Sequence, residues 1–291
     1  FKYTLIALLT IHETSYSHFD LLVEINEEFK KISLPEINNN LITDQDVISF
    51  YSRGLNIYKN YGLELDNNSS QIYKSNEISL NCNRHKLLFE QSNIIPRFCF
   101  NCYKVQVAPK SLIDLIKLFF VFDKLNLTND NTRKCIVELR SNIDGFYKGL
   151  IYCLNLDEAY KISMKLNLIL GSSISIYLAS TIKRGCSEYP LEYPQYKKIN
   201  LYGEQEMVYN EEWQKFEDKI DEGYKNWGKS YKTIEGFNLN SFLIIRNWIA
   251  YAQYIGDYSS DMITSENILR SNSKIFNYMK KVIPNKKLIF N

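Results

Sequence analysis

Four residues that could hold a metal ion lie close together in the first half of the chain. Two residues separate Cys82 from His85, and two residues separate Cys99 from Cys102. Two close ligand pairs joined by a loop of this length are typical of structural zinc sites, because thiolate and imidazole groups both suit Zn²⁺. The spacing predicts structural zinc in residues 81–102. The alternatives are metal-free thiols, a disulfide or redox pair, an iron–sulfur or catalytic metal site, or a ligand set in which Cys186 replaces His85.

A second group of reactive side chains follows an apolar run and surrounds Gly185. This group combines two cations, a thiol and a carboxylate: Lys183, Arg184, Cys186 and Glu188. Loops after strand ends often bind ligands, and paired cations hold phosphate or carboxylate groups. We expect three residues of a neighbouring strand to join this anionic-ligand site: Arg133, Lys134 and Arg140. The alternative is a solvated turn in which Gly185 supplies a positive φ.

A third motif begins at Lys148 and reads Lys-Gly-Leu-Ile-Tyr up to Tyr152. Its basic residue, glycine and second aromatic match the start of a known signature, so the segment resembles the RNA-recognition motif family. The resemblance covers only these few residues. Leu150 replaces the first aromatic, which removes one of the platforms on which bases stack. The resemblance implies RNA binding through Lys148 and Tyr152, and the alternative is a structural role within a strand.

The pattern over residues 103–185 predicts the elements that position these groups. Residues 103–107, 134–140, 147–154 and 173–182 read as strands. Helices are expected after Ser111 and Asn155, because each is followed three residues later by an acidic residue that completes a capping box. The resulting order, β-α-β-β-α-β, is that of a ferredoxin-like unit, and the fold class is α+β.

Alternation along the strands predicts which side chains share the sheet face that the helices leave open. These side chains include most of the charged residues of the strands: Lys104, Gln106, Lys134, Ile136, Glu138, Arg140, Lys148, Leu150 and Tyr152.

Helical segments are expected to flank the central unit. Residues 1–80 read as mostly helical, with helices over 18–31 and after a capping box formed by Thr43 and Asp46. Residues 186–291 read as aromatic-rich and mainly helical, with helices over 210–226 and 237–254 and from Ser265 onward. Residues 188–194 read as an extended connector, because prolines interrupt them.

Composition excludes several classes of protein. The chain has 291 residues, 45% of them hydrophobic and 23% charged, as in globular proteins. The net charge of +2 gives no global field that attracts nucleic acid or membranes, so any basic site must be local. No apolar run is long enough to span a bilayer, so we expect no membrane partner. Six cysteines in a chain of this length favour a reducing compartment, and we expect a soluble, cytoplasmic protein.

Motif searches leave the function open. The sequence has no phosphate-binding glycine loop, no nucleophile elbow and no H-E-x-x-H motif, and it has only three histidines. The leading hypothesis is a binding or interaction protein that is braced by zinc and recognises a protein partner or an anionic ligand. One alternative is an enzyme that acts on an anionic small molecule or glycan through residues 183–188. Another alternative is RNA binding on the open sheet face.

Overall fold

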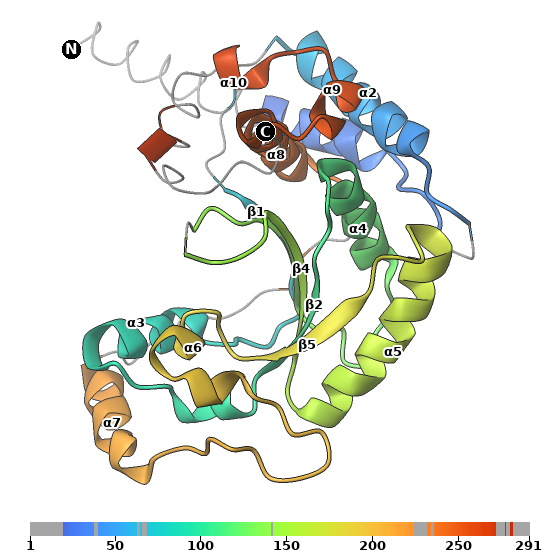
Figure 1. Cartoon of the computed structure of the whole chain (residues 1–291). Helices are drawn as coiled ribbons and strands as arrows, with labels where there is room; N and C mark the ends of the chain where they lie inside the picture. The colour runs from blue at the N-terminus through green and yellow to red at the C-terminus, as the bar shows by residue number, and fades with distance from the viewer. Residues whose placement is uncertain are drawn as a thin grey trace, which may run out of the picture.

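The computed structural model describes residues 20–37, 40–62, 65, 69–140, 142–223, 232–233, 236–271, 277 and 280–281. The protein has a mixed α+β architecture built on a five-stranded antiparallel sheet (Figure 1). This confirms the predicted fold class in its general form. The helices predicted for the first residues of the chain and for most of the last twenty lie outside the described residues.

The sheet places four strands of the predicted central unit beside one another and adds a fifth at its edge. The strands are β1 (Gln71–Lys74), β2 (Tyr103–Val107), β3 (Arg133–Val137), β4 (Tyr147–Cys153) and β5 (Ser180–Arg184). Their order across the sheet is β1-β3-β4-β2-β5. The register places Lys104 of β2 directly opposite both Lys183 of β5 and Tyr152 of β4.

Two helices cover one face of the sheet: α4 (Leu112–Lys124) and α5 (Leu156–Ser173). They begin where the capping signals predict, because the Ser111 side chain accepts a hydrogen bond from the Asp114 amide and Asn155 accepts one from the Glu158 amide. Helix α4 packs so closely that a β-carbon on Gly149 would lie 2.4 Å from Leu118. The glycine of the RNA-recognition-like motif therefore serves helix packing.

Further helices extend the core beyond the β1 end of the sheet, where they pack around α4 (Figure 1). Residues 20–30 are helical, and they are followed by α2 (Asp44–Asn60), α8 (Leu239–Ile255), α9 (Ser259–Ile263) and α10 (Ile268–Ser271). The predicted capping box of Thr43 and Asp46 is present at the start of α2. Asp257 ties this group to the sheet, because its carboxylate accepts hydrogen bonds from the Leu112 amide and the Tyr147 hydroxyl.

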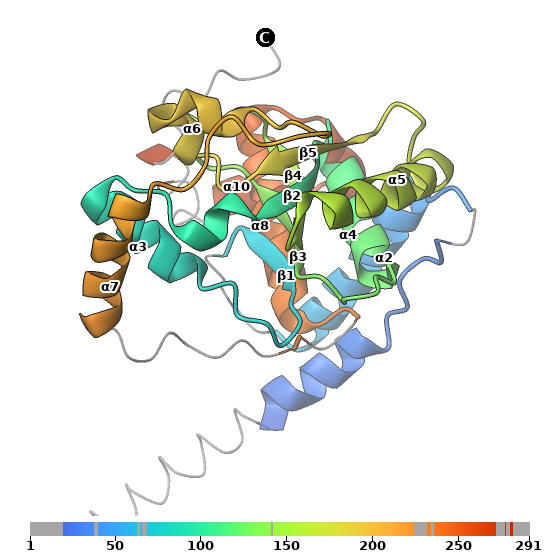
Figure 2. The same cartoon turned by 90° about the horizontal axis from the view of Figure 1, so that it is seen from below.

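Short elements lie on the opposite side of the sheet from α4 and α5 (Figure 2). They are α3 (Cys82–Ser92), η1 (Arg97–Phe100), α6 (Tyr189–Glu192), η2 (Pro194–Lys197), η3 (Glu211–Trp213) and α7 (Gln214–Gly223). Buried Arg84 joins α3 to α7 through Glu217 and Asp221. Tyr189 and Tyr196 form a small apolar cluster with residues of η1.

The structure departs from the sequence-based prediction at four places. The last strand spans residues 180–184 rather than 173–182, because α5 continues to Ser173 and residues 176–177 lie exposed in a turn. Residues 189–197 form two short helical turns instead of an extended connector. Strand β1 interrupts the N-terminal segment that reads as helical, and the segment predicted to hold zinc contains helix α3.

Candidate functional site

A cavity of about 810 Å³ lies against the sheet face that α4 and α5 leave open. Its floor consists of side chains from strands β1 to β4 and from residues 138 and 140, and all nine side chains predicted for the open face line it. Its walls are residues 75–90, which include the start of α3, and residues 183–189. We call it the sheet-face cavity. Its volume lies in the range of small-molecule binding sites.

Four lysines, one from each of four neighbouring strands, point into the sheet-face cavity. They are Lys134 of β3, Lys148 of β4, Lys104 of β2 and Lys183 of β5. Lys104 and Lys148 are buried, with 4% and 5% of their surface exposed, and the other two are partly buried. Ammonium groups rarely leave water unless something in the site compensates for the lost hydration.

Three of these lysines have thiol, hydroxyl or amide partners rather than carboxylates. Lys104 Nζ donates a hydrogen bond to Cys186 Sγ over 3.3 Å and lies 4.9 Å from the centre of the Tyr152 ring. Lys183 donates to the Ser187 hydroxyl, and Lys134 donates to neutral oxygens of β1. Within the described part of the chain, none of these three ammonium groups has a carboxylate within ion-pair distance.

The fourth lysine is neutralised. Lys148 Nζ lies 2.9 Å from Glu138 Oε2, and Arg140 Nε lies 2.8 Å from Glu138 Oε1. Arg140 also pairs with Glu188. Burial raises the pKa of Glu138, but hydrogen bonds from Arg140 and Lys148 outweigh this effect and lower the pKa to about 2. This end of the cavity is therefore an internally balanced ion-pair network.

The other end retains its positive charge. Burial lowers the pKa of Lys183 to about 8, and the nearby charge on Lys104 acts in the same direction. Because Lys104 and Lys183 are direct cross-strand neighbours, their like charges repel each other across the pair. An anion between them would relieve this repulsion.

The charged end of the cavity also contains thiols. Cys186 is partly exposed and faces Lys104, and Cys82 lies at the start of α3. Burial raises the pKa of Cys82, although the charge on Lys104 acts in the opposite direction. A sulfur atom in contact with an ammonium group is a nucleophile that a bound ligand can reach, so the arrangement allows ligand binding and also covalent chemistry at Cys186.

The cavity brings together seven of the nine residues that the sequence analysis names for ligand binding. These seven are Lys183, Cys186, Glu188, Lys134, Arg140, Lys148 and Tyr152. Arg184 lies elsewhere: it is buried against Phe100 and Tyr196 and donates to the Phe100 carbonyl. The physical reason is strand alternation, which sends Lys183 and Arg184 to opposite faces. The same rule turns Arg133 away from the cavity while Lys134 faces it.

The four predicted zinc ligands have different surroundings, and one of them, Cys102, packs with Leu150 and Tyr152 at the cavity floor. His85 is buried and stacks on Phe98, with its ring centre 5.2 Å from that of Phe98. Desolvation lowers the pKa of His85 to about 4. Cys99 contacts the Tyr189 hydroxyl, while Cys82 lines the cavity. Among the described residues, no group of three or more His, Cys, Asp or Glu side chains could hold a metal ion. The zinc site stays a prediction, which metal analysis of the reduced protein would test.

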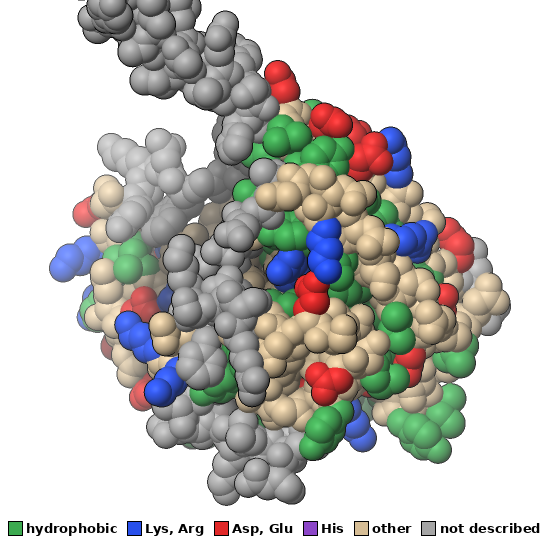
Figure 3. All heavy atoms as spheres, turned by 90° about the horizontal axis from the view of Figure 1, so that it is seen from above, with side chains coloured by type: hydrophobic (Ala, Val, Ile, Leu, Met, Phe, Trp, Pro, Cys, Tyr) green, Lys and Arg blue, Asp and Glu red, His purple; other side chains and the backbone are tan. Residues whose placement is uncertain are grey.

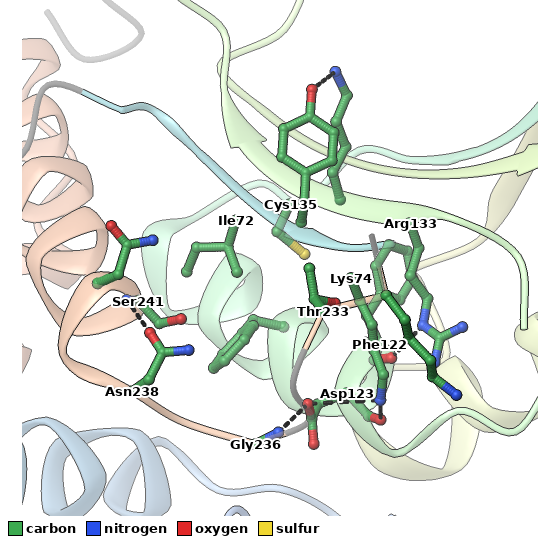
Figure 4. Close-up of a pocket in the computed structure, with 15 residues that line it drawn as sticks. Ile72, Lys74, Phe122, Asp123, Arg133, Cys135, Thr233, Gly236, Asn238 and Ser241 are labelled. Carbon is green, nitrogen blue, oxygen red and sulfur yellow. Dashed lines mark hydrogen bonds and ion pairs between the residues drawn. The ribbon is translucent and has the colours of Figure 1, made fainter. Parts of the chain in front are cut away.

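A second cavity, of about 350 Å³, lies beside β1 between α4 and the start of α8 (Figure 4). We call it the edge cavity. Lys74 Nζ donates to the Asp123 carbonyl, and the Gly236 amide donates to the Asp123 carboxylate. Arg133, with 1% of its surface exposed, donates to the carbonyls of Phe122 and Leu125. The protein itself therefore satisfies Lys74 and Arg133, whereas Lys134 lines both cavities.

The outer surface offers no comparable concentration of charge on the face in Figure 3, where basic and acidic side chains of the described residues are interspersed. In the described part of the chain, no helix combines the length and the apolar character that crossing a membrane requires.

Comparisons with family models, with curated proteins and with solved structures find no match to this chain.

Proposed function

We propose that the protein binds an anionic small molecule in the sheet-face cavity. The observation that carries this proposal is the set of three lysines, Lys104, Lys134 and Lys183, whose ammonium groups line one cavity without a carboxylate partner among the described residues. The Lys183–Glu188 loop forms one wall and the strands form the floor, so the site joins two groups that the sequence singles out separately.

Without a ligand, the facing lysines of the site lower the stability of the folded protein. Two lysines directly opposite each other on neighbouring strands destabilise the pair, and burial adds a desolvation penalty. Apolar side chains at the same positions would avoid both penalties. Buried side chains that lower stability in this way are typical of functional sites. An incoming anion pairs with the facing lysines, and the relief of their repulsion contributes to the free energy of binding.

Local charge supports the same proposal. The cavity lining contains seven Lys or Arg side chains and three Glu side chains, whereas the whole chain carries a net charge of only +2. Positive charge is thus concentrated in the cavity rather than spread over the molecule. Clefts lined by one sign of charge raise the local concentration of the oppositely charged ligand.

We also infer that residues 103–184 form a ferredoxin-like unit. The chain order β2-α4-β3-β4-α5-β5 supports this inference, as does the antiparallel order β3-β4-β2-β5, with both helices in contact with the sheet. Strand β1 adds an edge strand beside β3. In such a unit the second sheet face stays free for ligands, and that face is the cavity floor here.

Single-stranded RNA is the less favoured ligand. RNA-binding sheets expose aromatic rings on which bases stack. Here Tyr152 is 8% exposed, and its ring lies near the ammonium groups of Lys104 and Lys134. Tyr73 at the rim is 45% exposed, so of these two rings a base can reach only that of Tyr73.

Calorimetric titration with sodium sulfate at low ionic strength tests the proposal. We expect measurable binding that weakens at least tenfold in Lys104→Met. The matched control is Lys161→Met, which removes the same charge from an exposed residue on α5. Equal affinities in the wild type and in Lys104→Met, or no binding at millimolar sulfate, would refute the proposal.

A further inference from the structure

The positive charge of the sheet-face cavity falls into two separate groups. Lys104 and Lys183 face each other across adjacent strands and form what we call the paired-lysine subsite. Lys134 lies on β3, where its neighbour on β4 is Leu150 rather than a charged residue. Strand β4 thus separates the two groups. With ordinary strand spacing, the α-carbons of Lys104 and Lys134 are roughly 12 Å apart.

The ring of Tyr152 lies between the two groups. Its centre is 4.9 Å from Lys104 Nζ and 5.8 Å from Lys134 Nζ. The two nitrogens are therefore separated by no more than the sum of these distances, about 11 Å. Two linked anionic groups can therefore each contact one of the two ammonium groups while their linker lies over the Tyr152 ring.

The start of α3 adds hydrogen-bond donors on the wall of the same cavity. Residues 81–84 line the cavity, and no side chain caps the first turn of α3. The first amides of a helix lack partners inside the helix and favour anions. Of the positive charges that act on the Cys82 thiol, that of Lys104 lowers its pKa most, and both side chains line the same cavity.

The neutralised end of the cavity limits where anions can bind. Lys148 and Arg140 already share Glu138, so that corner does not need a further negative charge. An elongated ligand is therefore oriented, with its anionic groups near Lys104 and Lys134 and its uncharged part over Tyr152 and Leu150. Both of these side chains belong to the lining.

We infer that the ligand of the sheet-face cavity is a small molecule with two separate phosphoryl groups. One group binds at the paired-lysine subsite beside the start of α3, and the other binds at Lys134. Tetrahedral phosphoryl oxygens accept hydrogen bonds from several donors at once, which suits the convergence of lysines and helix amides. This inference rests on the proposed function and specifies the chemical class of its ligand.

A series of probes with fixed charge and increasing length tests the inference. Sulfate is compared with ethane-1,2-disulfonate, propane-1,3-disulfonate and butane-1,4-disulfonate, which do not titrate near neutral pH. We expect one disulfonate to bind about 10–100-fold more tightly than sulfate, because the second contact forms at high effective concentration. Glutarate, a dicarboxylate of similar length, should bind more weakly than that disulfonate.

Variants separate the two subsites. Lys134→Met should remove the advantage of the disulfonate over sulfate, whereas Lys134→Arg should retain the advantage. Equal affinity for sulfate and every disulfonate would overturn the two-group inference, and so would glutarate binding as tightly as the best disulfonate. Both results would leave the proposed function standing, whereas absence of any anion binding would refute both.

Discussion

The sheet-face cavity and the edge cavity both contain buried basic side chains, but the protein treats these side chains differently. In the edge cavity, Arg133 and Lys74 donate to backbone carbonyls, and Asp123 lies beside them. In the sheet-face cavity, Lys104 and Lys183 have a thiol and a hydroxyl as partners. A buried cation with protein acceptors braces the fold, whereas one without them is available to a ligand.

The two kinds of buried cation should also contribute differently to the stability of the fold. Removing a cation that satisfies buried carbonyls leaves those acceptors unpaired, which costs free energy. Removing a cation that is repelled by its neighbour relieves strain in the unliganded protein. Substitutions of equal chemistry in the two cavities should therefore differ in their effect on the free energy of unfolding.

The largest expected effect is the loss of stability in Arg133→Met. The guanidinium donates to the carbonyls of Phe122, Leu125 and Asn131, and only 1% of the surface of Arg133 is exposed. We expect the free energy of unfolding to fall by about 3–5 kcal/mol, measured by urea denaturation. Lys104→Met is the matched variant and should change stability by less than about 1 kcal/mol, in either direction. A larger loss of unfolding free energy in Lys104→Met than in Arg133→Met would contradict the proposed difference between the two cavities.

Strand alternation explains how much of this difference could be predicted from the sequence. It correctly places Lys104, Lys134, Lys148 and Tyr152 on one face, because side chains two residues apart share a face. Applied consistently, the rule would also have excluded Arg133 and Arg184 from that face.

Other features depend on contacts between distant segments. Nothing local in the sequence indicates that residues 75–90 fold over the sheet and close the cavity. The difference between Lys148 and Lys183 arises because Glu138, which follows the end of β3, forms an ion pair with Lys148. The zinc prediction used spacing alone, whereas the ring of His85 packs on Phe98. Sequence separation carries no information about these tertiary partners.

The second prediction concerns affinity in the sheet-face cavity. Lys183→Met should weaken sulfate binding about tenfold at pH 7, or about 1.4 kcal/mol, because one of the two facing ammonium groups is lost. Lys74→Met in the edge cavity removes the same charge and should leave sulfate affinity within twofold. A comparable loss in both variants would show that long-range charge, rather than the subsite, governs binding.

The third prediction is a pH dependence that belongs to one cavity. Burial, together with the charge on Lys104, lowers the pKa of Lys183 from 10.5 to about 8. Sulfate affinity should therefore fall as the pH rises through about 8, because neutral Lys183 no longer attracts the anion. The unfolding free energy should gain a contribution over the window from about 8 to 10.5, where the unfolded chain binds more protons.

Arginine at position 183 provides the control for this titration. Lys183→Arg keeps a positive charge at every pH of the measurement, since guanidinium does not lose its proton. The step in sulfate affinity near pH 8 should disappear while affinity at pH 7 is largely retained. Persistence of the step in this variant would assign the titration to another group.

The smallest expected effect concerns one thiol in each cavity. Cys186 lies against Lys104 in the sheet-face cavity, and buried Cys135 lines the edge cavity, where burial raises its pKa. Saturating sulfate should slow alkylation of Cys186 by iodoacetamide about two- to fivefold, because the bound anion blocks access and engages Lys104. Cys135 should remain unmodified with or without sulfate.

Peptide mass spectrometry follows both thiols in one experiment, in a Cys82→Ser background that removes the other cavity thiol. Lys104→Met should abolish the sulfate effect on Cys186 without exposing Cys135. If sulfate protects Cys186 equally in that variant, the anion does not bind beside Lys104. If sulfate instead changes the reactivity of Cys135, the anion acts on the whole fold, and the two cavities are not independent.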